Sequence, residues 1–485
     1  MRLSLNPAMM MDFYELTMSQ VFFDEGIHEQ TACFDLFFRR IPESGGYALM
    51  AGLQPVIDYL NNFKFRDEDI SYLRSLGRFS EAFLAYLADM KFSCDVWAIR
   101  EGTPLFPHEP IMKVRGPLIQ AQLIETMLLL TINHQCLIAT KAARIVRAAE
   151  GRQVMEFGAR RAQGADAAFY GARSAYIGGV DASSLTASGE HFDMPVAGTM
   201  AHSFVQSFPD EYSAFRAYAK RYPESCVLLI DTYNTLDQGL PNAIRIQREI
   251  LDPLGYRLKG VRIDSGDLAY LSVRAREILD EAGMHECKII ASNSLDEDII
   301  RELLRQGARI DSFGVGERLI TAKSEPVFGG VYKLSAIEVN GVLEARMKIS
   351  ENVAKVTNPG SKRVYRFYDR DTDMALADLI CLEGESVDPD SYEIFDPVQT
   401  WKRKVLENYY VRDLLEPVFE AGKCVYPDYD LASIRLYAQK QQAQLWDAVK
   451  RFEFPHQYYV DLSEKLWTLK QNFLAQHANK HRLKK

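Results

Sequence analysis

The chain has 485 residues, of which 47% are hydrophobic and 25% charged, the balance of an ordinary globular protein. Its 57 lysines and arginines against 66 aspartates and glutamates give a formal net charge of −9, which argues against nucleic-acid binding because phosphate contacts need clustered positive charge. No uninterrupted apolar run approaches the roughly 18 residues of a membrane-spanning helix, and the N-terminus lacks the apolar core of a signal peptide. We therefore expect neither a nucleic-acid nor a membrane partner.

The first third of the chain mixes both kinds of secondary structure. Residues 31–41 predict a strand, residues 54–63 and 81–90 predict helices, and two short β runs are expected within 96–114. Residues 118–149 form a long apolar stretch with charges at helical spacing. We assign residues 1–150 to an N-terminal α/β domain.

From residue 152 short apolar runs recur, each ending in polar residues or glycine. Helical patterns fill most of the gaps between them, which is the rhythm of β-α-β units. The seven runs are 154–160, 175–179, 196–204, 227–233, 260–266, 289–294 and 312–317. So many units in one segment favour an α/β barrel over residues 151–330, with an open sheet as the alternative.

The pattern changes after residue 330. Two β runs flank Asn340-Gly341, a dipeptide typical of hairpin turns. Residues 331–400 are expected to supply return hairpins and a basic loop, and the segments after about residue 335 to complete the N-terminal domain.

The last part of the chain is predicted from weaker patterns. Acidic residues 370–395 indicate loops, whereas 400–422 and 429–480 indicate helices. We therefore predict a helical C-terminal extension over residues 401–485.

The seven cysteines are scattered and form no C-x-x-C pair. An odd count without close spacing argues against a disulfide framework and against a zinc site. We predict no metal held by protein ligands alone, and a cytoplasmic location, where thiols stay reduced.

In an α/β barrel the chemistry lies at the carboxyl ends of the strands. Polar residues and glycines end all seven runs, which is hard to explain as coincidence although each one could be structural. These residues are Arg160, Arg161, Asp181, Ser184, His202, Ser203, Asp231, Arg262, Asp264, Ser292, Asn293, Gly314 and Gly316.

Several common motifs are absent from the sequence. It contains no Walker A loop, no G-x-G-x-x-G, no H-E-x-x-H and no G-x-S-x-G. The usual nucleotide-binding loops, zinc proteases and serine hydrolases are therefore not indicated.

His202, in GTMAHSF, is the first candidate for chemistry. A histidine at a strand end can act as an acid, a base or a nucleophile, and the alternative is a histidine that caps the next helix. Asp231 ends the following run and could orient the imidazole through one ring nitrogen. The pair favours function.

Arg262 and Asp264 alternate along one run, so their side chains point to the same side of a strand. A carboxylate can bind the two hydroxyls of a sugar, and a guanidinium matches phosphate or carboxylate oxygens. The alternative is an ion pair between the two residues.

Two further motifs fit an aromatic acid and a phosphate. Phe157 offers a flat apolar face beside the positive charges of Arg160 and Arg161. Gly314 and Gly316 would let backbone N–H groups approach an anion, a weak signal by itself.

These motifs together resemble the nicotinate phosphoribosyltransferase family, a type II phosphoribosyltransferase family. The resemblance covers residues 12 to about 360 and lies in long, ordered motifs: DFYELTM, EFGARRAQG, GTMAHSF, LLIDTYNT, RIDSGD, ASNSLDE, DSFGVGERLI and KISENVAKVTNPG. It implies an irregular α/β barrel beside an N-terminal α/β domain.

The resemblance also implies an activity. The family joins nicotinate to 5-phosphoribosyl 1-diphosphate in NAD biosynthesis, giving nicotinate mononucleotide and diphosphate. It couples this reaction to ATP hydrolysis through a phosphorylated histidine, here His202. Mg²⁺ is expected to bind mainly through the substrate phosphates, and a homodimer with shared active sites is expected.

Roles for individual residues follow from the same resemblance. Tyr14 would close over the pyridine from the partner subunit, with Phe157 on the other ring face. Asp264 would hold the ribose hydroxyls, and Ser184 would meet the acceptor carboxylate. The remaining candidates for the 5-phosphate, the diphosphate and the carboxylate are Ser292, Asn293, Gly314, Gly316, Arg160, Arg161, Arg262 and Lys348.

Two other functions stay open at this point. A nicotinamide or quinolinate phosphoribosyltransferase would have the same barrel. A non-catalytic sugar-phosphate sensor would have the fold alone, although the presence of His202, Asp231, Arg262 and Asp264 argues against it.

Overall fold

The computed structural model describes residues 5–352 and 355–482, with side chains described as far as residue 478, and divides into two units. Unit 1 comprises Met1–Leu137, Val327–Tyr429 and Leu436–Lys485, and unit 2 comprises Ile138–Pro326 and Asp430–Arg435. The division falls inside the long helix α6 (Glu125–Ala148), so the first domain boundary lies before the expected residue 150.

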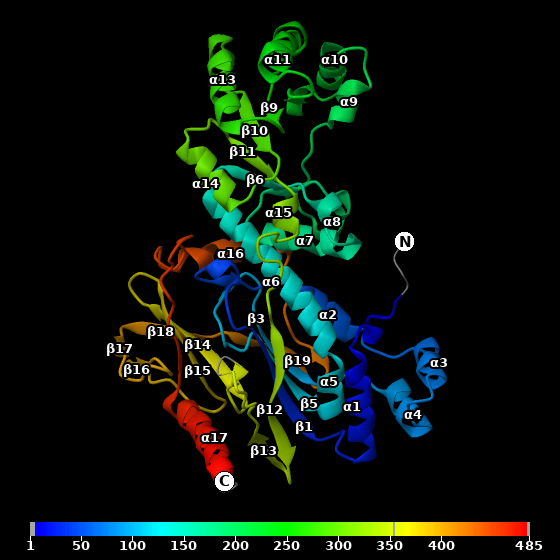
Figure 1. Ribbon diagram of the computed structural model, residues 1–485, viewed down its shortest axis with the longest axis vertical. Coiled ribbons are helices and arrows are strands. Elements are labelled where there is room, and N and C mark those ends of the chain that lie inside the picture. The colour runs from blue at the N-terminus through cyan, green and yellow to red at the C-terminus, as the bar shows by residue number, and fades with distance from the viewer. Residues whose placement is uncertain (1–4, 353–354, 483–485) are drawn as a thin grey trace. The chain divides into compact units, whose positions relative to one another are not determined.

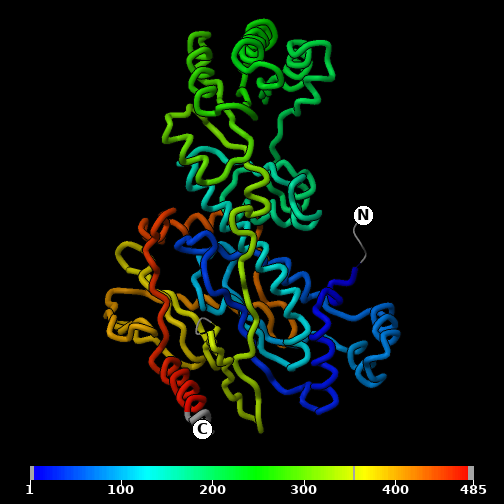
Figure 2. The backbone as a smooth tube through the Cα atoms, viewed as in Figure 1, coloured from blue at the N-terminus to red at the C-terminus, as the bar shows by residue number. Residues whose placement is uncertain are grey.

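Unit 1 is built around a seven-stranded antiparallel sheet. Strands β1, β5 and β3, from the first half of the sequence, lie next to one another at its centre, with strands from the second half on both sides. Figure 2 shows the yellow-green segment 331–345 beside the blue chain of β1. The strand order is β13 (Val342–Ala345), β12 (Val331–Val339), β1 (Thr31–Phe37), β5 (Met112–Pro117), β3 (Asp95–Ile99), β19 (Leu415–Glu420) and β20 (Lys423–Cys424).

The expected hairpin at Asn340-Gly341 is confirmed. Both residues have positive φ, 53° and 79°, and they join β12 to β13. Two residues in the left-handed region give the turn a twist that matches the twist of the strands, which is why asparagine and glycine are favoured there.

The expectation of helices at 400–422 is wrong, and so is that of loops throughout 370–395. These residues form strands in the seven-stranded sheet, a second sheet and a hairpin. The second sheet has the order β18 (Tyr409–Asp413), β14 (Lys362–Asp369), β15 (Ala375–Leu382) and β21 (Val460–Leu462), and the hairpin pairs β16 (Ser391–Phe395) with β17 (Arg403–Glu407). In β17 only Leu406 is buried, and three of the other four residues are charged, so this edge strand resembles a polar helix by composition.

The helices of unit 1 agree better with expectation. Those predicted near 54–63 and 81–90 are present, and the predicted long helix is split in two. The helices are α1 (Phe13–Asp24), α2 (Leu53–Asn61), α3 (Asp67–Ser75), α4 (Glu81–Asp89), α5 (Leu118–Leu123), α6, α16 (Leu431–Ala443) and α17 (Glu464–Arg482), and β2 (Ala48–Leu49) pairs with β4 (Pro104–Leu105).

Among the described residues one helical stretch, Leu118–Ala148, is long and apolar enough to cross a membrane by length and composition, with a mean hydropathy of 1.3 over an 18-residue window. A search for uninterrupted apolar runs misses it because isolated charges such as Glu125 and Lys141 interrupt the stretch. Inside the protein 67% of that window is buried. A buried core helix passes the same test, so the stretch is weak evidence for a membrane span.

Unit 2 holds a curled parallel sheet of six strands, several of them labelled in Figure 1. The order is β7 (Ala182–Ser183), β6 (Gln153–Glu156), β11 (Ser312–Val315), β10 (Lys288–Ser292), β9 (Gly260–Ile263) and β8 (Val227–Leu229). In the described part of the chain no pairing joins β7 to β8, so the sheet is a half-barrel rather than a closed barrel. The α/β class is confirmed.

Two of the seven predicted strands of this unit are wrong. Residues 175–179 lie at the end of helix α7 (Ala165–Ile177), and residues 196–204 contain an isolated bridge at Val196 and the start of α9 (His202–Gln206). Helix α7 is buried from Gly171 to Ile177, and a short run that is apolar on every side does not distinguish a buried helix from a strand.

Helices connect the parallel strands of unit 2 and bring every strand's carboxyl end to one edge of the sheet. Helix α13 packs on β9 and β10. Besides α7 and α9, the helices are α8 (Thr186–Phe192), α10 (Glu211–Arg221), α11 (Leu240–Ile246), α12 (Asp252–Leu254), α13 (Leu268–Glu281), α14 (Glu297–Arg305) and α15 (Glu317–Ile320), with π-helical turns at Thr235–Gly239 and Gln247–Leu251.

Candidate active site

A network centred on Arg262 lies at the carboxyl edge of this sheet. Arg262, on β9, donates from Nη2 to Asp264 Oδ1 at 3.0 Å and from Nε to Ser292 Oγ at 2.9 Å. The Ser292 hydroxyl in turn donates to Asp264 Oδ1. The three side chains close a ring of hydrogen bonds across β9 and β10. The ion pair considered from the sequence is thus formed, and it leaves Asp264 Oδ2 outside the ring.

The other side of the guanidinium fixes the chain before His202. Arg262 Nη1 donates to Thr199 Oγ1 at 3.1 Å and to the Met200 carbonyl at 3.3 Å. The guanidinium carbon also lies 5.7 Å from the centre of the Phe157 ring. Thr199 was not predicted, because a hydroxyl within a loop has no spacing pattern of its own.

His202 begins the short helix α9, and its side chain is 39% exposed. Its Nδ1 lies 3.1 Å from Thr232 Oγ1, and its Nε2 lies 3.7 Å from Asp264 Oδ2. The imidazole therefore lies between a hydroxyl and a carboxylate, with one edge open to solvent.

The expectation that Asp231 orients His202 is wrong in this structure. Asp231 Oδ2 accepts from the Asp264 backbone N–H at 3.0 Å and from Ser265 Oγ at 2.6 Å. It fixes the turn that carries Asp264, while the next residue, Thr232, contacts the imidazole. A carboxylate is the more familiar partner of a histidine, so sequence reasoning chose the wrong neighbour.

Asp264 is held in its charged form. Burial acts to raise its pKa, but the Ser292 hydrogen bond, the Arg262 guanidinium and nearby His202 together lower the pKa below its ordinary value. The site therefore offers a fixed negative oxygen, Oδ2, beside an imidazole. Such an oxygen can accept hydrogen bonds from a sugar diol.

Phe157 forms an apolar wall of the site, and glycine makes room for it. A Cβ atom at Gly314 would lie 2.6 Å from the Phe157 ring, and the Phe157 backbone N–H donates to the Val315 carbonyl at 2.7 Å. Gly314 thus lies buried beneath the ring, and its expected role as an anion contact stays a prediction. For Gly316, before α15, the phosphate role stays a prediction.

Four other predicted residues follow strand ends and are exposed. Arg160 and Arg161 lie in a 3-10 turn after β6, and Arg161 Nε is 4.0 Å from Glu317 Oε2. Ser184 follows β7, and Asn293 follows β10 with a φ of 96°, a left-handed conformation that re-aims the chain after the strand. Exposed charges and hydroxyls at this edge are free to meet a ligand.

Asp181 has a structural task instead. Its Oδ1 accepts from Arg435 Nη2 at 2.9 Å, and its Oδ2 accepts from the Val154 backbone N–H at 2.9 Å. This acid therefore holds the 430–435 segment within unit 2 and does not face an acceptor.

Proteins and family models with similar sequences cover almost the whole chain. The model of the nicotinate phosphoribosyltransferase (NAPRTase) family matches residues 152–377, and models of its N-terminal and C-terminal domains match 9–133 and 361–470. A Bacillus subtilis nicotinate phosphoribosyltransferase is 46% identical over 460 residues, covering 95% of this chain and 93% of that one. The chain belongs to the nicotinate phosphoribosyltransferase family.

More distant members extend the same match. A Homo sapiens nicotinate phosphoribosyltransferase is 33% identical, covering 96% of each chain. The crystal structure of human nicotinic acid phosphoribosyltransferase superimposes with a TM-score of 0.84 at 32% identity, covering 95% of this chain and 99% of that one. The Pyrococcus furiosus nicotinate-nucleotide pyrophosphorylase, at 21% identity and a TM-score of 0.69 over 92% and 98% of the two chains, shares the fold. The resemblance drawn from the motifs is confirmed.

Two residues expected in the site of this family lie in unit 1. Tyr14, on α1, is 44% exposed, and its pKa is raised by partial burial and by the nearby carboxylates of Glu125 and Glu15. Lys348 is exposed, and its backbone N–H donates to Thr357 Oγ1 at 3.1 Å. Their roles toward substrate stay predictions.

The described residues hold no group of three or more histidine, cysteine, aspartate or glutamate side chains placed to bind a metal. One buried oxygen at the site, Asp231 Oδ1, has no hydrogen-bond partner among them. A single carboxylate oxygen fits Mg²⁺ that is held otherwise by substrate phosphates and water.

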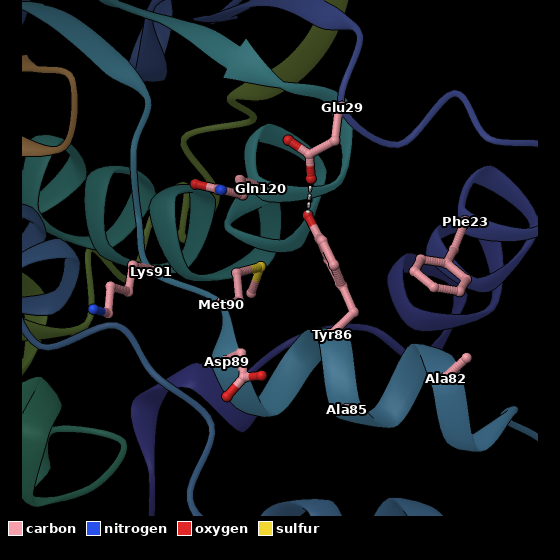
Figure 3. Close-up of a pocket in the computed structure, with 9 residues that line it drawn as sticks. All are labelled: Phe23, Glu29, Ala82, Ala85, Tyr86, Asp89, Met90, Lys91 and Gln120. Atoms are coloured by element: carbon pink, nitrogen blue, oxygen red, sulfur yellow. Dashed lines mark hydrogen bonds between the residues drawn. The ribbon is translucent and has the colours of Figure 1, made fainter.

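Two surface hollows lie away from these residues. Figure 3 shows one of about 510 Å³ in unit 1, where the Tyr86 hydroxyl donates to Glu29 at 2.7 Å beside Lys91 and Gln120. Another of about 500 Å³ lies between α11 and α13 in unit 2. Neither is lined by a predicted site residue of this family.

Proposed function

We propose that this protein transfers the phosphoribosyl group of 5-phosphoribosyl 1-diphosphate to nicotinate. The pyridine nitrogen forms a bond to the anomeric carbon, the bond from that carbon to diphosphate breaks, and nicotinate mononucleotide and diphosphate are released. The 46% identity over 95% of the chain to a protein of this name carries the proposal. The charged network around Asp264 supports it on chemical grounds.

The residues of the network suit the demands of this displacement. The anomeric carbon gains positive charge as diphosphate leaves, and Asp264 can bind the ribose hydroxyls through Oδ2 at that moment. Arg262 and Arg160 offset phosphate charge. Phe157 stacks on the pyridine ring, and Ser184 meets the acceptor carboxylate, where a hydroxyl donor suits an anion.

The 5-phosphate is proposed to bind at the ends of β10 and β11. Ser292 and Asn293 supply a hydroxyl and an amide, and the backbone N–H of Gly316 lies at the start of the next turn. Arg161 adds positive charge for the diphosphate or the carboxylate, and the resemblance to the family makes Lys348 a further candidate.

We further propose that ATP hydrolysis is coupled through His202. A nitrogen of its imidazole attacks the γ-phosphorus, the bond to ADP breaks, and water later cleaves the phosphohistidine to release phosphate. The exposed ring edge and the contact with Thr232 support this role. Phosphoryl transfer depends mainly on positioning and charge neutralisation, and both are present here.

The diphosphate part of the reaction calls for a divalent cation. When bound, Mg²⁺ neutralises the phosphate oxygens and makes diphosphate a better leaving group. In this chain Asp231 is the carboxylate of the network that would lie nearest such an ion, while its Oδ2 keeps the Asp264 turn in place.

The active assembly is proposed to be a cytoplasmic homodimer. Helix α1 exposes the apolar side chains Phe13, Tyr14 and Val21, of which Tyr14 would reach the partner subunit's pyridine. The seven cysteines are free and six of them are buried, which supports a reducing location.

A comparison of acceptors tests the reaction class. The purified protein is incubated with 5-phosphoribosyl 1-diphosphate, Mg²⁺ and ATP, together with nicotinate, nicotinamide or quinolinate, and the mononucleotides are separated by chromatography. We expect nicotinate to give the highest kcat/KM. Faster turnover of nicotinamide or quinolinate would overturn the choice of acceptor, and no product from any of the three would favour a non-catalytic protein.

A further inference from the structure

Glu156 is a fully buried carboxylate for which the proposed reaction has no use. It is the last residue of β6, and its side chain is 0% exposed. Its Oε1 accepts from the Gly158 backbone N–H, and its Oε2 accepts from Ser183 Oγ at 2.6 Å. Burial of an ionisable group is costly, and here burial raises the pKa of the carboxyl, opposed by these two bonds. A group kept at this cost calls for an explanation.

The two bonds join the two elements proposed to bind the acceptor. Gly158 directly follows Phe157, whose ring forms the apolar wall, and Ser183 directly precedes Ser184. A backbone hydrogen bond also joins the two elements: the Ser184 N–H donates to the Glu156 carbonyl at 2.9 Å. Glu156 therefore sets the spacing between the ring face and the hydroxyl.

The carboxylate also fixes the direction of the Ser183 hydroxyl. The Ser183 hydroxyl donates to Glu156 Oε2, which acts as an acceptor in this contact. The Ser183 oxygen is then left to accept from the Leu185 backbone N–H at 3.0 Å. A neutral side chain in place of Glu156 would not impose this orientation on the 183–185 segment.

The same segment is continuous with the chain that leads to His202. The Ser183 N–H donates to the Pro195 carbonyl at 3.1 Å, and the Ala197 N–H donates to the Ser183 carbonyl at 2.9 Å. Ser183 thus takes part in four hydrogen bonds. Glu156 contributes a side chain to one of them, and the other three partners are backbone groups.

We propose that Glu156 is a positioning residue for acceptor specificity: it holds Phe157 and Ser184 at the separation that fits a planar aromatic carboxylate. The inference rests on the proposed function and concerns the acceptor half of the site. The Arg262–Asp264–Ser292 network, which would hold the phosphoribosyl half, has no hydrogen bond to Glu156 among the described contacts. The two halves should therefore respond separately to substitution.

Glu156→Gln tests this with little change in shape. The amide oxygen can still accept from Gly158, but the amide nitrogen then faces Ser183 and reverses its hydroxyl. We expect the KM for nicotinate to rise about tenfold, the size of one charge-assisted hydrogen bond. The KM for 5-phosphoribosyl 1-diphosphate should stay within about twofold, and the preference for nicotinate over nicotinamide should fall.

Ser183→Ala removes the same bond from its other end. We expect it to give a similar rise in the KM for nicotinate, and the double variant to be no worse than the worse single variant, because one interaction is lost in all three. Ser272→Ala is the matched control. Ser272 is also buried in unit 2, but its hydroxyl donates to the Ala269 carbonyl at 3.0 Å within helix α13, so both KM values should stay at the wild-type level.

The outcomes separate this inference from the proposed function. If the wild type converts nicotinate but Glu156→Gln leaves its KM unchanged, or raises both KM values equally, the inference is wrong and the function stands. Additive effects of the two substitutions would also contradict it. A wild type that forms no mononucleotide from nicotinate contradicts the proposed function and the inference together.

Discussion

The two units each contain an arginine–aspartate pair, and the two pairs differ in what surrounds them. In unit 1 Arg366 binds Asp378 through two bonds of 2.7 and 2.6 Å, with the side chains 1% and 0% exposed. In unit 2 Arg262 and Asp264 share one bond of 3.0 Å, with the side chains 14% and 28% exposed. We call the buried pair in unit 1 the closed pair, and the partly exposed pair in unit 2 the open pair.

The surroundings complete the contrast. Arg366 Nη2 also donates to the Pro104 carbonyl, and Tyr458 donates to Asp378 Oδ1, so protein groups use both ends of the pair. Asp264 keeps Oδ2 turned toward His202 at 3.7 Å. In the closed pair both the guanidinium and the carboxylate bind other protein groups, which stabilises the fold. In the open pair Asp264 Oδ2 remains able to bind a ligand. The following substitutions should act on activity in unit 2 and on stability in unit 1.

The largest effect is expected from Asp264→Asn. The amide keeps the shape and one acceptor for Arg262 but removes the negative charge that the anomeric carbon would meet as diphosphate leaves. We expect kcat/KM for nicotinate mononucleotide formation to fall about 10³-fold. The melting temperature should change little, and a large loss of stability with unchanged kcat/KM would reverse the contrast between the two pairs.

Arg366→Met should lower stability and leave the activity of the folded protein unchanged. It leaves the Asp378 carboxylate buried without its cation, which should lower the free energy of unfolding by about 3 kcal/mol. Urea unfolding followed by circular dichroism measures this loss. Activity per folded molecule should equal that of the wild type, and a variant as stable as the wild type would show that the closed pair does not support the fold.

Thr232→Val tests whether the Thr232 hydroxyl positions the His202 imidazole in the open site. Valine keeps the shape of threonine and removes the hydroxyl 3.1 Å from His202 Nδ1. We expect phosphohistidine formation from γ-labelled ATP to slow about tenfold, and Thr232→Ser to keep a rate near that of the wild type. Equal rates for Val and Ser would mean that the hydroxyl does not position the imidazole.

The smallest effect concerns Glu15 in unit 1, which accepts from the hydroxyl and the backbone N–H of Thr126. Burial raises the pKa of Glu15 to about 7. Between its ordinary pKa and 7 the folded state binds more protons than the unfolded state, so stability falls as pH rises through this range.

Glu15→Gln should remove that dependence. We expect the wild type to lose about 1 kcal/mol more than the variant between pH 6 and pH 7.5 in urea titrations. Parallel pH profiles for the two proteins would show that the carboxyl of Glu15 titrates normally.

Much of the open site was predictable from the sequence because alternation in a strand is a strong signal. Arg262 and Asp264 are two residues apart and do lie on one side of β9, and His202 does lie beside them. Thr199, Thr232 and Glu156 were missed because they contact residues of other elements, and no local spacing marks such contacts.

The errors in the fold have a related physical cause. Residues 175–179 are apolar because α7 is buried, and residues 403–407 are polar because β17 lies at an edge. In both places burial by the rest of the molecule determined the composition, and local periodicity did not reveal the element type.

The most direct test of the account is nicotinate mononucleotide formation by the wild type and by His202→Ala, each with and without ATP. We expect the wild type to form the mononucleotide, ATP to stimulate this reaction, and labelled ATP to leave an acid-labile phosphate on the protein. His202→Ala should keep a slow transfer that ATP does not stimulate, and should take up no label. A wild type without nicotinate mononucleotide formation, or a His202→Ala variant with full ATP stimulation, would contradict it.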